Sequence, residues 1–320
     1  MFSYASLKLM RRILVTGGAG YLGSILVPAL LETGYHVTVV DNLMYKQTSL
    51  ATCFKYRNFE FHKIDIRAEN SMQKLMSRAD VIIPLAAIVG APACDNDPWA
   101  ASEINNVATI RMLKLSSPSQ LVLMPTTNSA YGSGNENNYC DETSPLRPLS
   151  RYAKDKVEVE NALKERGNFV SFRLATVFGF SPRMRLDLLV NYLCFRAVTD
   201  NFVMMYEGNF KRNYVHVRDV TQAFMLALEN EEAMINQIFN VGLSSANISK
   251  IELCEEIKKF VPEFYFSEIP FRQDPDQRNY IVSNQKIEGI GFSPEFSIQD
   301  GIRELTQGIA AFQDARFSNF

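Results

Sequence analysis

The sequence predicts an α/β protein, with a doubly wound parallel sheet followed by a smaller C-terminal lobe. The first observation behind this prediction is that short apolar runs alternate with amphipathic segments of helical length from Arg12 onward, as in strands joined by crossover helices. The second is a glycine-rich turn directly after the first apolar run. The third is size, because 320 residues with 47% hydrophobic side chains can bury a large sheet and a second lobe.

The strands of this sheet are expected at the apolar runs, in chain order at residues 13–16, 36–40, 59–64, 81–85, 120–124 and 169–174. The amphipathic segments predict connecting helices at residues 21–33, 99–115 and 152–166. Because crossovers between parallel strands are right-handed, this order favours a sheet with helices on both faces.

After Gly179 the pattern becomes less regular. Helices are expected there at residues 186–196, 219–228, 250–260 and 298–312, and short strands at residues 203–206 and 214–217. We therefore expect an N-terminal extension at residues 1–11, the sheet domain at residues 12–175 and the smaller lobe at residues 176–320. An apolar run at residues 238–241 could also return to the main sheet, so its placement stays open.

Charge and cysteine usage exclude several kinds of protein. A net charge of −2 at pH 7 gives no field that would attract nucleic acid or an anionic membrane. The five cysteines are scattered and never form a CxxC pattern, which argues against a disulfide framework or a zinc site. Residues 1–11 lack the order of a secretory signal, and no apolar run approaches the roughly eighteen residues that cross a bilayer. We expect a cytoplasmic protein with no metal, nucleic-acid or membrane partner.

The glycine-rich turn, TGGAGYLG at residues 16–23, has the spacing of a phosphate-binding turn between a strand and a helix. Gly17 permits the tight turn, Gly20 lets backbone N–H groups approach a pyrophosphate, and Gly23 lets the helix pack closely on the sheet. The expected cofactor contacts in this turn are Gly17, Gly20, Tyr21, Leu22 and Gly23.

Asp41 ends the second predicted strand, where the adenosine ribose of a dinucleotide would lie. Its carboxylate can accept a hydrogen bond from a 2′-hydroxyl and would repel a 2′-phosphate, so NAD is favoured over NADP. The alternative is that Asp41 and Asn42 only turn the chain.

Tyr152 and Lys156 are four residues apart at the start of a predicted helix, so both side chains lie on one face. A phenol has a reference pKa of about 10, and a nearby ammonium favours its ionised form. Lysine can therefore make tyrosine a working proton acceptor. The alternative is an ordinary solvated helix face.

A second polar motif, TTNSAYG at residues 126–132, follows a predicted strand at the edge of the sheet where ligands bind in such folds. The alternative is an ordinary polar turn rich in hydroxyl groups.

Several further motifs accompany these: Asp41-Asn42-Leu43, Asp65-Ile66, Leu85-Ala86-Ala87, Asn105, FRLATVFG and RNYVHVRDV. With them the chain resembles the extended short-chain dehydrogenase/reductases of the NAD-dependent epimerase/dehydratase family, from about Arg12 to Phe312. The resemblance implies an NAD-binding Rossmann domain at residues 12–175 and a nucleotide-sugar-binding lobe at residues 176–320.

The resemblance also implies roles for single residues. Thr127 would hydrogen-bond the sugar oxygen being oxidised, Tyr152 would take its proton, and Lys156 would hold the nicotinamide ribose and tune the tyrosine. The remaining cofactor contacts implied are Asn42, Asp65 and Ile66 near the adenosine, Leu85, Ala86 and Ala87 in the cofactor cleft, and Asn105.

The expected reaction is indicated by the two residues that directly follow Thr127. Family members that eliminate water from C6 carry an acidic pair there, whereas this chain has Asn128 and Ser129, which we expect to contact substrate instead. Neither is a carboxylic acid, so 4,6-dehydration is disfavoured and oxidation at C4 remains, by a 4-dehydrogenase or a 4-epimerase. A 4,6-dehydratase, a 4-keto reductase and a non-catalytic NAD(H)-binding regulatory protein stay open as alternatives.

The resemblance places Arg212 and Arg278 on the substrate diphosphate, with Arg183 and Arg185 adding positive charge nearby. A solvated surface position is the alternative for each of these arginines. His216 is expected to be a half-buried strand residue rather than a catalytic base, because no triad partner is spaced to suggest one.

Two finer expectations follow from the resemblance. The chain looks particularly like family members that oxidise C4 of a GDP-linked heptose in capsule polysaccharide biosynthesis, which implies a GDP-heptose or a related hexose as substrate. The helices at residues 99–115 and 152–166 are the pair through which relatives form a four-helix seam, which implies at least a homodimer. Burial of these helix faces inside the monomer is the alternative.

Overall fold

The computed structural model describes residues 11–132, 139–269 and 279–312. It divides into two compact units. Unit 1 comprises Met1–Thr126, Arg151–Phe172 and Phe224–Ile238; unit 2 comprises Thr127–Ser150, Arg173–Ala223 and Phe239–Phe320. The sequence predicts a single boundary near residue 176, whereas the chain passes between the units repeatedly. The reason is that three strands begin in unit 1 and end in unit 2, namely Leu121–Thr127, Phe169–Leu174 and Gln237–Val241.

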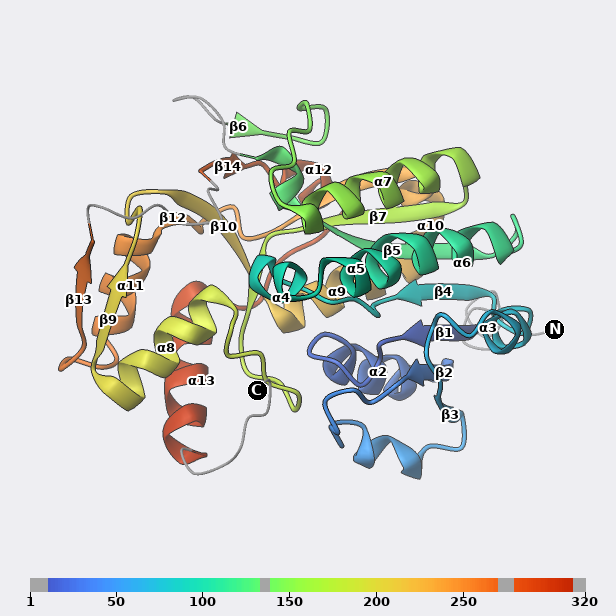
Figure 1. The fold of residues 1–320 in the computed structure, drawn as a ribbon, viewed down its shortest axis with the longest axis horizontal. Coiled ribbons are helices and arrows are strands. Elements are labelled where there is room, and N and C mark those ends of the chain that lie inside the picture. The colour runs from blue at the N-terminus through green and yellow to red at the C-terminus, as the bar shows by residue number, and fades with distance from the viewer. Residues whose placement is uncertain (1–10, 133–138, 270–278, 313–320) are drawn as a thin grey trace. The chain divides into compact units, whose positions relative to one another are not determined.

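A seven-stranded sheet with the order β11-β7-β5-β4-β1-β2-β3 forms the centre of the fold (Figure 1). Its strands are β1 (Arg12–Thr16), β2 (His36–Asp41), β3 (Phe59–Lys63), β4 (Val81–Pro84), β5 (Leu121–Thr127), β7 (Phe169–Leu174) and β11 (Gln237–Val241). The pairs β1–β2, β1–β4, β2–β3 and β4–β5 are parallel. This order confirms the doubly wound α/β fold, and the run at residues 238–241 does return to the main sheet.

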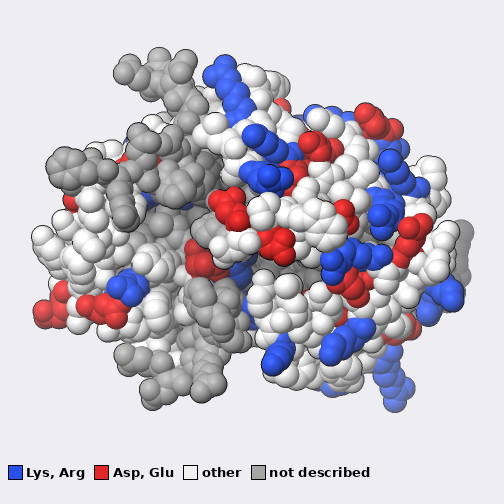
Figure 2. Space-filling model, viewed as in Figure 1, with Lys and Arg blue, Asp and Glu red and all other residues white. Residues whose placement is uncertain are grey.

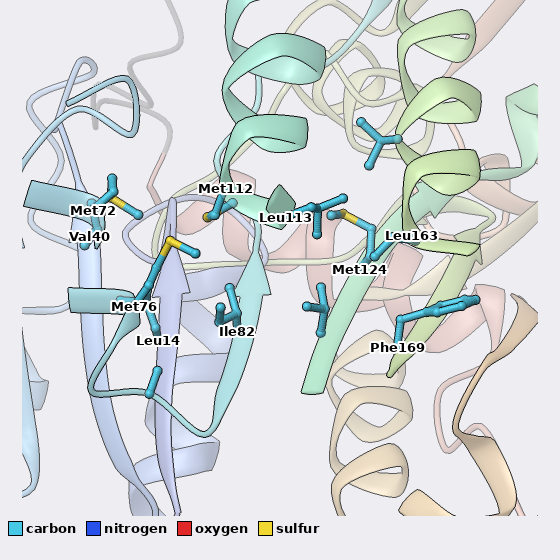
Figure 3. Packing of buried hydrophobic residues seen from close by; sticks show 13 residues of the cluster. Leu14, Val40, Met72, Met76, Ile82, Met112, Leu113, Met124, Leu163 and Phe169 are labelled. Carbon is cyan, nitrogen blue, oxygen red and sulfur yellow. The ribbon is translucent and has the colours of Figure 1, made fainter. Parts of the chain in front are cut away.

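The helices of unit 1 pack on the sheet through buried apolar side chains. One face carries α3 (Glu69–Met76), α6 (Thr109–Leu115) and α7 (Arg151–Arg166), whose side chains form one cluster with Leu14 and Val40 of the strands (Figure 3). Successive strand residues point to opposite faces, so Val39 faces away from this cluster. The opposite face receives α9 (Val217–Glu229), because Phe224 packs on Phe172 with ring centroids 4.9 Å apart.

The predicted helix at residues 99–115 is interrupted. It consists of α5 (Pro98–Ser102), a π-helical turn η2 (Glu103–Ala108) and α6. The wider turn shows in the hydrogen bond from Thr109 Oγ1 to the carbonyl oxygen of Ile104, five residues back, at 3.0 Å. Such turns insert one residue into a helix and often occur at functional sites.

Unit 2 is built from short strands and helices. Its elements include β6 (Tyr139–Cys140), β8 (Thr176–Phe178), α8 (Leu189–Asp200), β9 (Phe202–Met205), β10 (Lys211–His216), β12 (Asn247–Ser249), α11 (Lys250–Lys258), β13 (Tyr265–Glu268), β14 (Ile281–Val282) and α13 (Ile298–Ala311). Strand β10 lies between β12 and β8. The starts of α11 and α13 are fixed by capping boxes, Ser249 with Glu252 and Ser297 with Asp300.

Acidic and basic side chains are interspersed on the face shown in Figure 2. In the part of the chain that the structure describes, no helix has both the length and the apolar character required to cross a bilayer.

Candidate active site

The glycine turn of unit 1 connects β1 to α2 (Gly23–Glu32). Gly17 has φ +65°, and its N–H donates to the carbonyl oxygen of Val40 at 2.7 Å. A Cβ atom on Gly17 would lie 2.5 Å from the backbone nitrogen of Ala86, the second residue after β4. Position 17 therefore requires glycine for two reasons, its left-handed backbone and the close approach of the segment that follows β4.

The close packing that the sequence analysis assigns to Gly23 is divided between two glycines. A Cβ on Gly23 would lie 2.3 Å from the carbonyl oxygen of Gly18, within the turn itself. A Cβ on Gly18 would lie 2.8 Å from Cγ1 of Val39 on β2. Gly18, which the sequence analysis gives no role, is therefore the residue that lets the turn approach the sheet. Its place as the second glycine of TGGAG is the only sequence signal for it.

Asp41 connects the glycine turn to the loop after β2. Its Oδ2 accepts from the N–H of Ala19 at 3.0 Å, and its Oδ1 accepts from the N–H of Leu43 at 2.8 Å. The side chain is buried. Asp41 does turn the chain, as the alternative interpretation held, and the same carboxylate also fixes the phosphate turn. The two interpretations are therefore compatible.

Asp65 lies after β3 and is held by a residue that the sequence analysis missed. Arg67 donates from Nε to Oδ1 at 2.8 Å and from Nη2 to Oδ2 at 2.9 Å, and Asn42 Nδ2 donates to Oδ2 at 3.2 Å. These hydrogen bonds, that of the Arg67 side chain first, lower the pKa of Asp65 to about 2. Ile66 packs against the core cluster. Asp65 and Ile66, the two residues expected near the adenosine, are thus an anionic carboxylate and an adjacent apolar side chain.

The segment after β4 is fixed from two sides. Leu85 N–H donates to the carbonyl oxygen of Thr16 at 2.9 Å, and the N–H of Ala86 donates to Thr16 Oγ1 at 3.4 Å. Asn105, fully buried in η2, accepts from Ile88 N–H at 2.8 Å and donates to the carbonyl oxygen of Ile88 at 2.8 Å. Ala87 lies between these anchored residues. Asn105 therefore holds the predicted cofactor-lining segment by its backbone.

Tyr152 and Lys156 lie together on α7, as their spacing predicts. Lys156 Nζ is 6.0 Å from the centroid of the Tyr152 ring. Lys156 is only 4% exposed, and burial lowers its pKa to about 8. Among the described residues no oxygen accepts a hydrogen bond from its ammonium. A buried ammonium with three unused donors fits the hydroxyls of a nicotinamide ribose, and the glycine turn at the start of α2 fits a pyrophosphate.

Unit 2 contains Thr127 and the two residues after it. Thr127 is buried, and its Oγ1 accepts from Ser129 N–H at 3.1 Å and donates to Ser129 Oγ at 3.0 Å. Asn128 is 1% exposed, and both polar atoms of its amide are enclosed and lack a hydrogen-bond partner. The contact of Asn128 with substrate therefore stays a prediction.

Tyr131, the other tyrosine of these motifs, has a structural role. Its hydroxyl donates to Asn240 Oδ1 at 2.8 Å and accepts from Arg173 Nη1 at 3.0 Å. Burial raises the pKa of Tyr131 to about 12. A phenol with such a pKa stays protonated at neutral pH, so Tyr131 is unsuited to accept a proton.

The predicted phosphate-binding arginines of unit 2 differ in their surroundings. Arg212 on β10 is 4% exposed and Arg183 is 7% exposed, so neither is the solvated surface residue of the alternative interpretation. Arg183 Nη1 donates to the carbonyl oxygen of Met184 at 2.5 Å. Arg185 pairs with Asp187 through two nitrogens, with Nε to Oδ1 at 2.8 Å, which neutralises most of its charge. Arg278 lies outside the described residues.

His216 is fully buried, so the expectation of a half-buried residue was wrong. Its Nδ1 accepts from Arg218 N–H at 3.3 Å, which leaves Nε2 to donate to Glu304 Oε2 at 2.9 Å. The ring stacks on Phe296, with centroids 4.3 Å apart. His216 therefore anchors α13 to β10, and its partner is Glu304, 88 residues further along the chain.

Comparison with known proteins gives consistent results. The profile of the NAD dependent epimerase/dehydratase family matches residues 13–242. The low-salt glycan biosynthesis protein Agl12 of Haloferax volcanii is 27% identical over 301 residues, which are 91% of this chain and 96% of that protein. A dTDP-glucose 4,6-dehydratase of Streptomyces niveus is 27% identical over 321 residues, 92% of each chain. The crystal structure of UDP-glucose 4-epimerase from Thermotoga maritima with UDP-glucose superimposes with a TM-score of 0.84 at 26% identity, covering 94% of this chain and 99% of that one.

Proposed function

The chain belongs to the NAD-dependent epimerase/dehydratase family, and we propose that within it the protein oxidises the C4 hydroxyl of a nucleotide-diphosphate sugar. Its cofactor is NAD, which when bound supplies the acceptor for the hydride that leaves C4. The observation that carries the proposal is the buried Lys156 ammonium beside Tyr152 on one face of α7. A protein that only binds NAD has no use for an activated phenol.

The proton steps are assigned to three side chains. Tyr152 as the phenolate takes the C4 hydroxyl proton while the C–O bond becomes a carbonyl. Lys156 stabilises that phenolate electrostatically and holds the nicotinamide ribose. Thr127 turns its hydroxyl proton from Ser129 toward the sugar oxygen, which orients the oxygen for proton transfer.

Oxidation without dehydration is supported by the residues after Thr127. Loss of water from C6 needs an acid to protonate the leaving hydroxyl, and Asn128 and Ser129 supply none. A dehydratase among the relatives keeps 4,6-dehydration as the competing outcome. We favour a 4-dehydrogenase or a 4-epimerase, with a GDP-linked heptose or related hexose as the substrate to test first.

The substrate diphosphate is assigned to the arginines of unit 2. Buried guanidinium groups at Arg183 and Arg212 can make forked hydrogen bonds to phosphate oxygens. Arg278 completes the set in this proposal. Arg185 contributes less, because Asp187 already neutralises it.

The test is to incubate the purified protein with NAD and a panel of GDP-, UDP-, CDP- and dTDP-sugars. The absorbance of reduced nicotinamide and the mass and NMR spectra of the products are recorded. A 4-keto sugar or its C4 epimer is the expected product. Products that have lost water identify a 4,6-dehydratase, and an unchanged panel with tight NAD binding would refute the proposal in favour of a regulatory NAD(H)-binding protein.

A further inference from the structure

Asp155 lies one residue before Lys156 in α7 and is buried, although it is a carboxylate. It is 6% exposed, Ser102 Oγ donates to its Oδ1 at 3.4 Å, and its Oδ2 has no hydrogen-bond partner. Burying a carboxylate with one oxygen unsatisfied costs stability. A role in anchoring α7 does not explain why a carboxylate is buried here, because a neutral side chain could accept the hydrogen bond from Ser102 at a lower cost in stability.

Asn105 and Asn106, which are consecutive in the π-helical turn η2, contact different parts of the predicted cofactor site. Asn105 holds the backbone of Ile88 after β4. Asn106 hydrogen-bonds Glu158 on α7 and also lies within hydrogen-bonding reach of Asp155. Asp155 is therefore held by the hydrogen bond from Ser102 of α5, and Asn106 of η2 lies beside it.

The charges around Lys156 are few. The titratable groups that act on Lys156 are Asp155 from its own helix and Cys94 from α4 (Ala91–Asn96). Of these two groups, Asp155 has the larger effect on Lys156. Besides Lys156 itself, the charged groups that act on Asp155 are Glu158 and Arg151, both on α7. Asp155 is thus the fixed negative charge that offsets the burial of the Lys156 ammonium at neutral pH.

Adjacent residues of an α-helix point about 100° apart, so the Asp155 carboxylate acts on Lys156 through space without accepting its protons. We propose that Asp155 is a positioning residue whose buried carboxylate keeps the Lys156 ammonium charged while leaving its donors available to the cofactor and to Tyr152. The roles of Tyr152 and Lys156 in this inference rest on the proposed function, whereas the electrostatic effect of Asp155 does not.

The ionisation of Lys156 supports this inference. Burial lowers the pKa of Lys156 to about 8, and Asp155 acts in the opposite direction. Without the Asp155 carboxylate the pKa of Lys156 would fall further, so a larger fraction of Lys156 would be neutral at pH 7. A neutral amine no longer stabilises a phenolate.

The test follows the titration of Lys156 directly, in protein without substrate. The protein is made with lysine labelled with ¹³C at Cε, and the Lys156 resonance is assigned by its absence in Lys156→Met. In Asp155→Asn the midpoint of this resonance should fall by about one pH unit. Glu158→Gln is the matched control, because it makes the same acid-to-amide change three residues later, at an exposed site that shares Asn106; its midpoint should stay at the wild-type value.

An unchanged Lys156 midpoint in a folded Asp155→Asn protein would overturn the inference. If that variant does not fold, Asp155→Ser removes the same charge with a smaller side chain and must give the same fall, while Asp155→Glu must restore the midpoint. A lowered midpoint in a protein that oxidises no sugar on the panel would leave this inference standing and refute the proposed function. Turnover of a sugar on the panel, together with an unchanged Lys156 midpoint in Asp155→Asn, would support the proposed function and refute this inference.

Discussion

In the proposed mechanism, the burial of Lys156 sets the upper end of the pH range in which Tyr152 can take a proton. A folded-state pKa of about 8, below the ordinary lysine value, means that the ammonium is present below pH 8 and is lost as the pH rises through 8. Because the charged form stabilises the phenolate and holds the ribose, turnover should fall about tenfold per pH unit well above that midpoint.

The measurement is the pH profile of kcat on the sugar that reacts, at saturating NAD. Lys156→Arg is the informative control, because arginine keeps its charge across this range: its residual activity should not fall near pH 8. A wild-type profile that stays flat up to pH 10 would contradict the assignment.

Gly17 offers a second test at a single residue. Gly17→Ala meets both a positive φ and the backbone nitrogen of Ala86 at 2.5 Å, so we expect a loss of about 3 kcal/mol or more in the free energy of unfolding. Gly291→Ala is the matched control, since Gly291 has φ +106° but nothing within 4 Å of the added Cβ. It isolates backbone strain and should cost about 1 kcal/mol. Equal losses in thermal or urea unfolding would show that the contact with Ala86 is unimportant.

Single-residue roles could be predicted from the sequence only where the motif is local. The spacing of Tyr152 and Lys156 places both on one helical face, and their contact follows from helix geometry alone. The partner of His216 could not be found in this way, because Glu304 lies 88 residues away and meets it only through the packing of α13. The enclosure of Asn128 likewise depends on packing, which residue type does not reveal.

Among the elements, strands were predicted best. β7 was expected at residues 169–174 and is Phe169–Leu174. The helix at residues 99–115 was predicted as continuous and is split by the π turn η2. One inserted residue barely alters a hydrophobic pattern over this length, so the sequence gives no signal for it.

The π turn leads to a prediction for the segment after β4. Asn105→Ala removes both hydrogen bonds to Ile88 and leaves its backbone groups unsatisfied, which should cost about 2 kcal/mol of stability and weaken NAD binding about tenfold by loosening residues 85–88. Calorimetric titration with NAD measures the affinity. Asn230→Ala, which removes an exposed amide bonded to Leu226, serves as the control and should leave NAD affinity unchanged. Wild-type affinity in Asn105→Ala would refute the positioning role of Asn105.

At the scale of the whole molecule, the chain exposes apolar side chains on the helices predicted to form a dimer seam. Trp99 on α5 is 72% exposed and Val107 on η2 is 39% exposed. Exposed tryptophan is uncommon on a monomer and frequent at interface centres. We therefore propose a homodimer that buries Trp99.

Sedimentation measures this directly. Wild-type protein should sediment as a dimer at micromolar concentration, and Trp99→Glu should raise the dissociation constant at least about tenfold. Phe54→Glu replaces another exposed aromatic of unit 1, 67% exposed, and should leave the dimer intact. A wild-type monomer, or equal effects of both substitutions, would count against this interface.

The most direct test of the account is a single-turnover experiment on Tyr152→Phe. Wild-type and variant proteins are loaded to the same NAD occupancy and mixed with the reactive nucleotide sugar, and the formation of reduced nicotinamide is followed by absorbance. The account predicts that the variant retains NAD binding and that its rate of reduction falls by about three orders of magnitude. A variant that reduces NAD at close to the wild-type rate would contradict the claim that Tyr152, activated by Lys156, takes the proton.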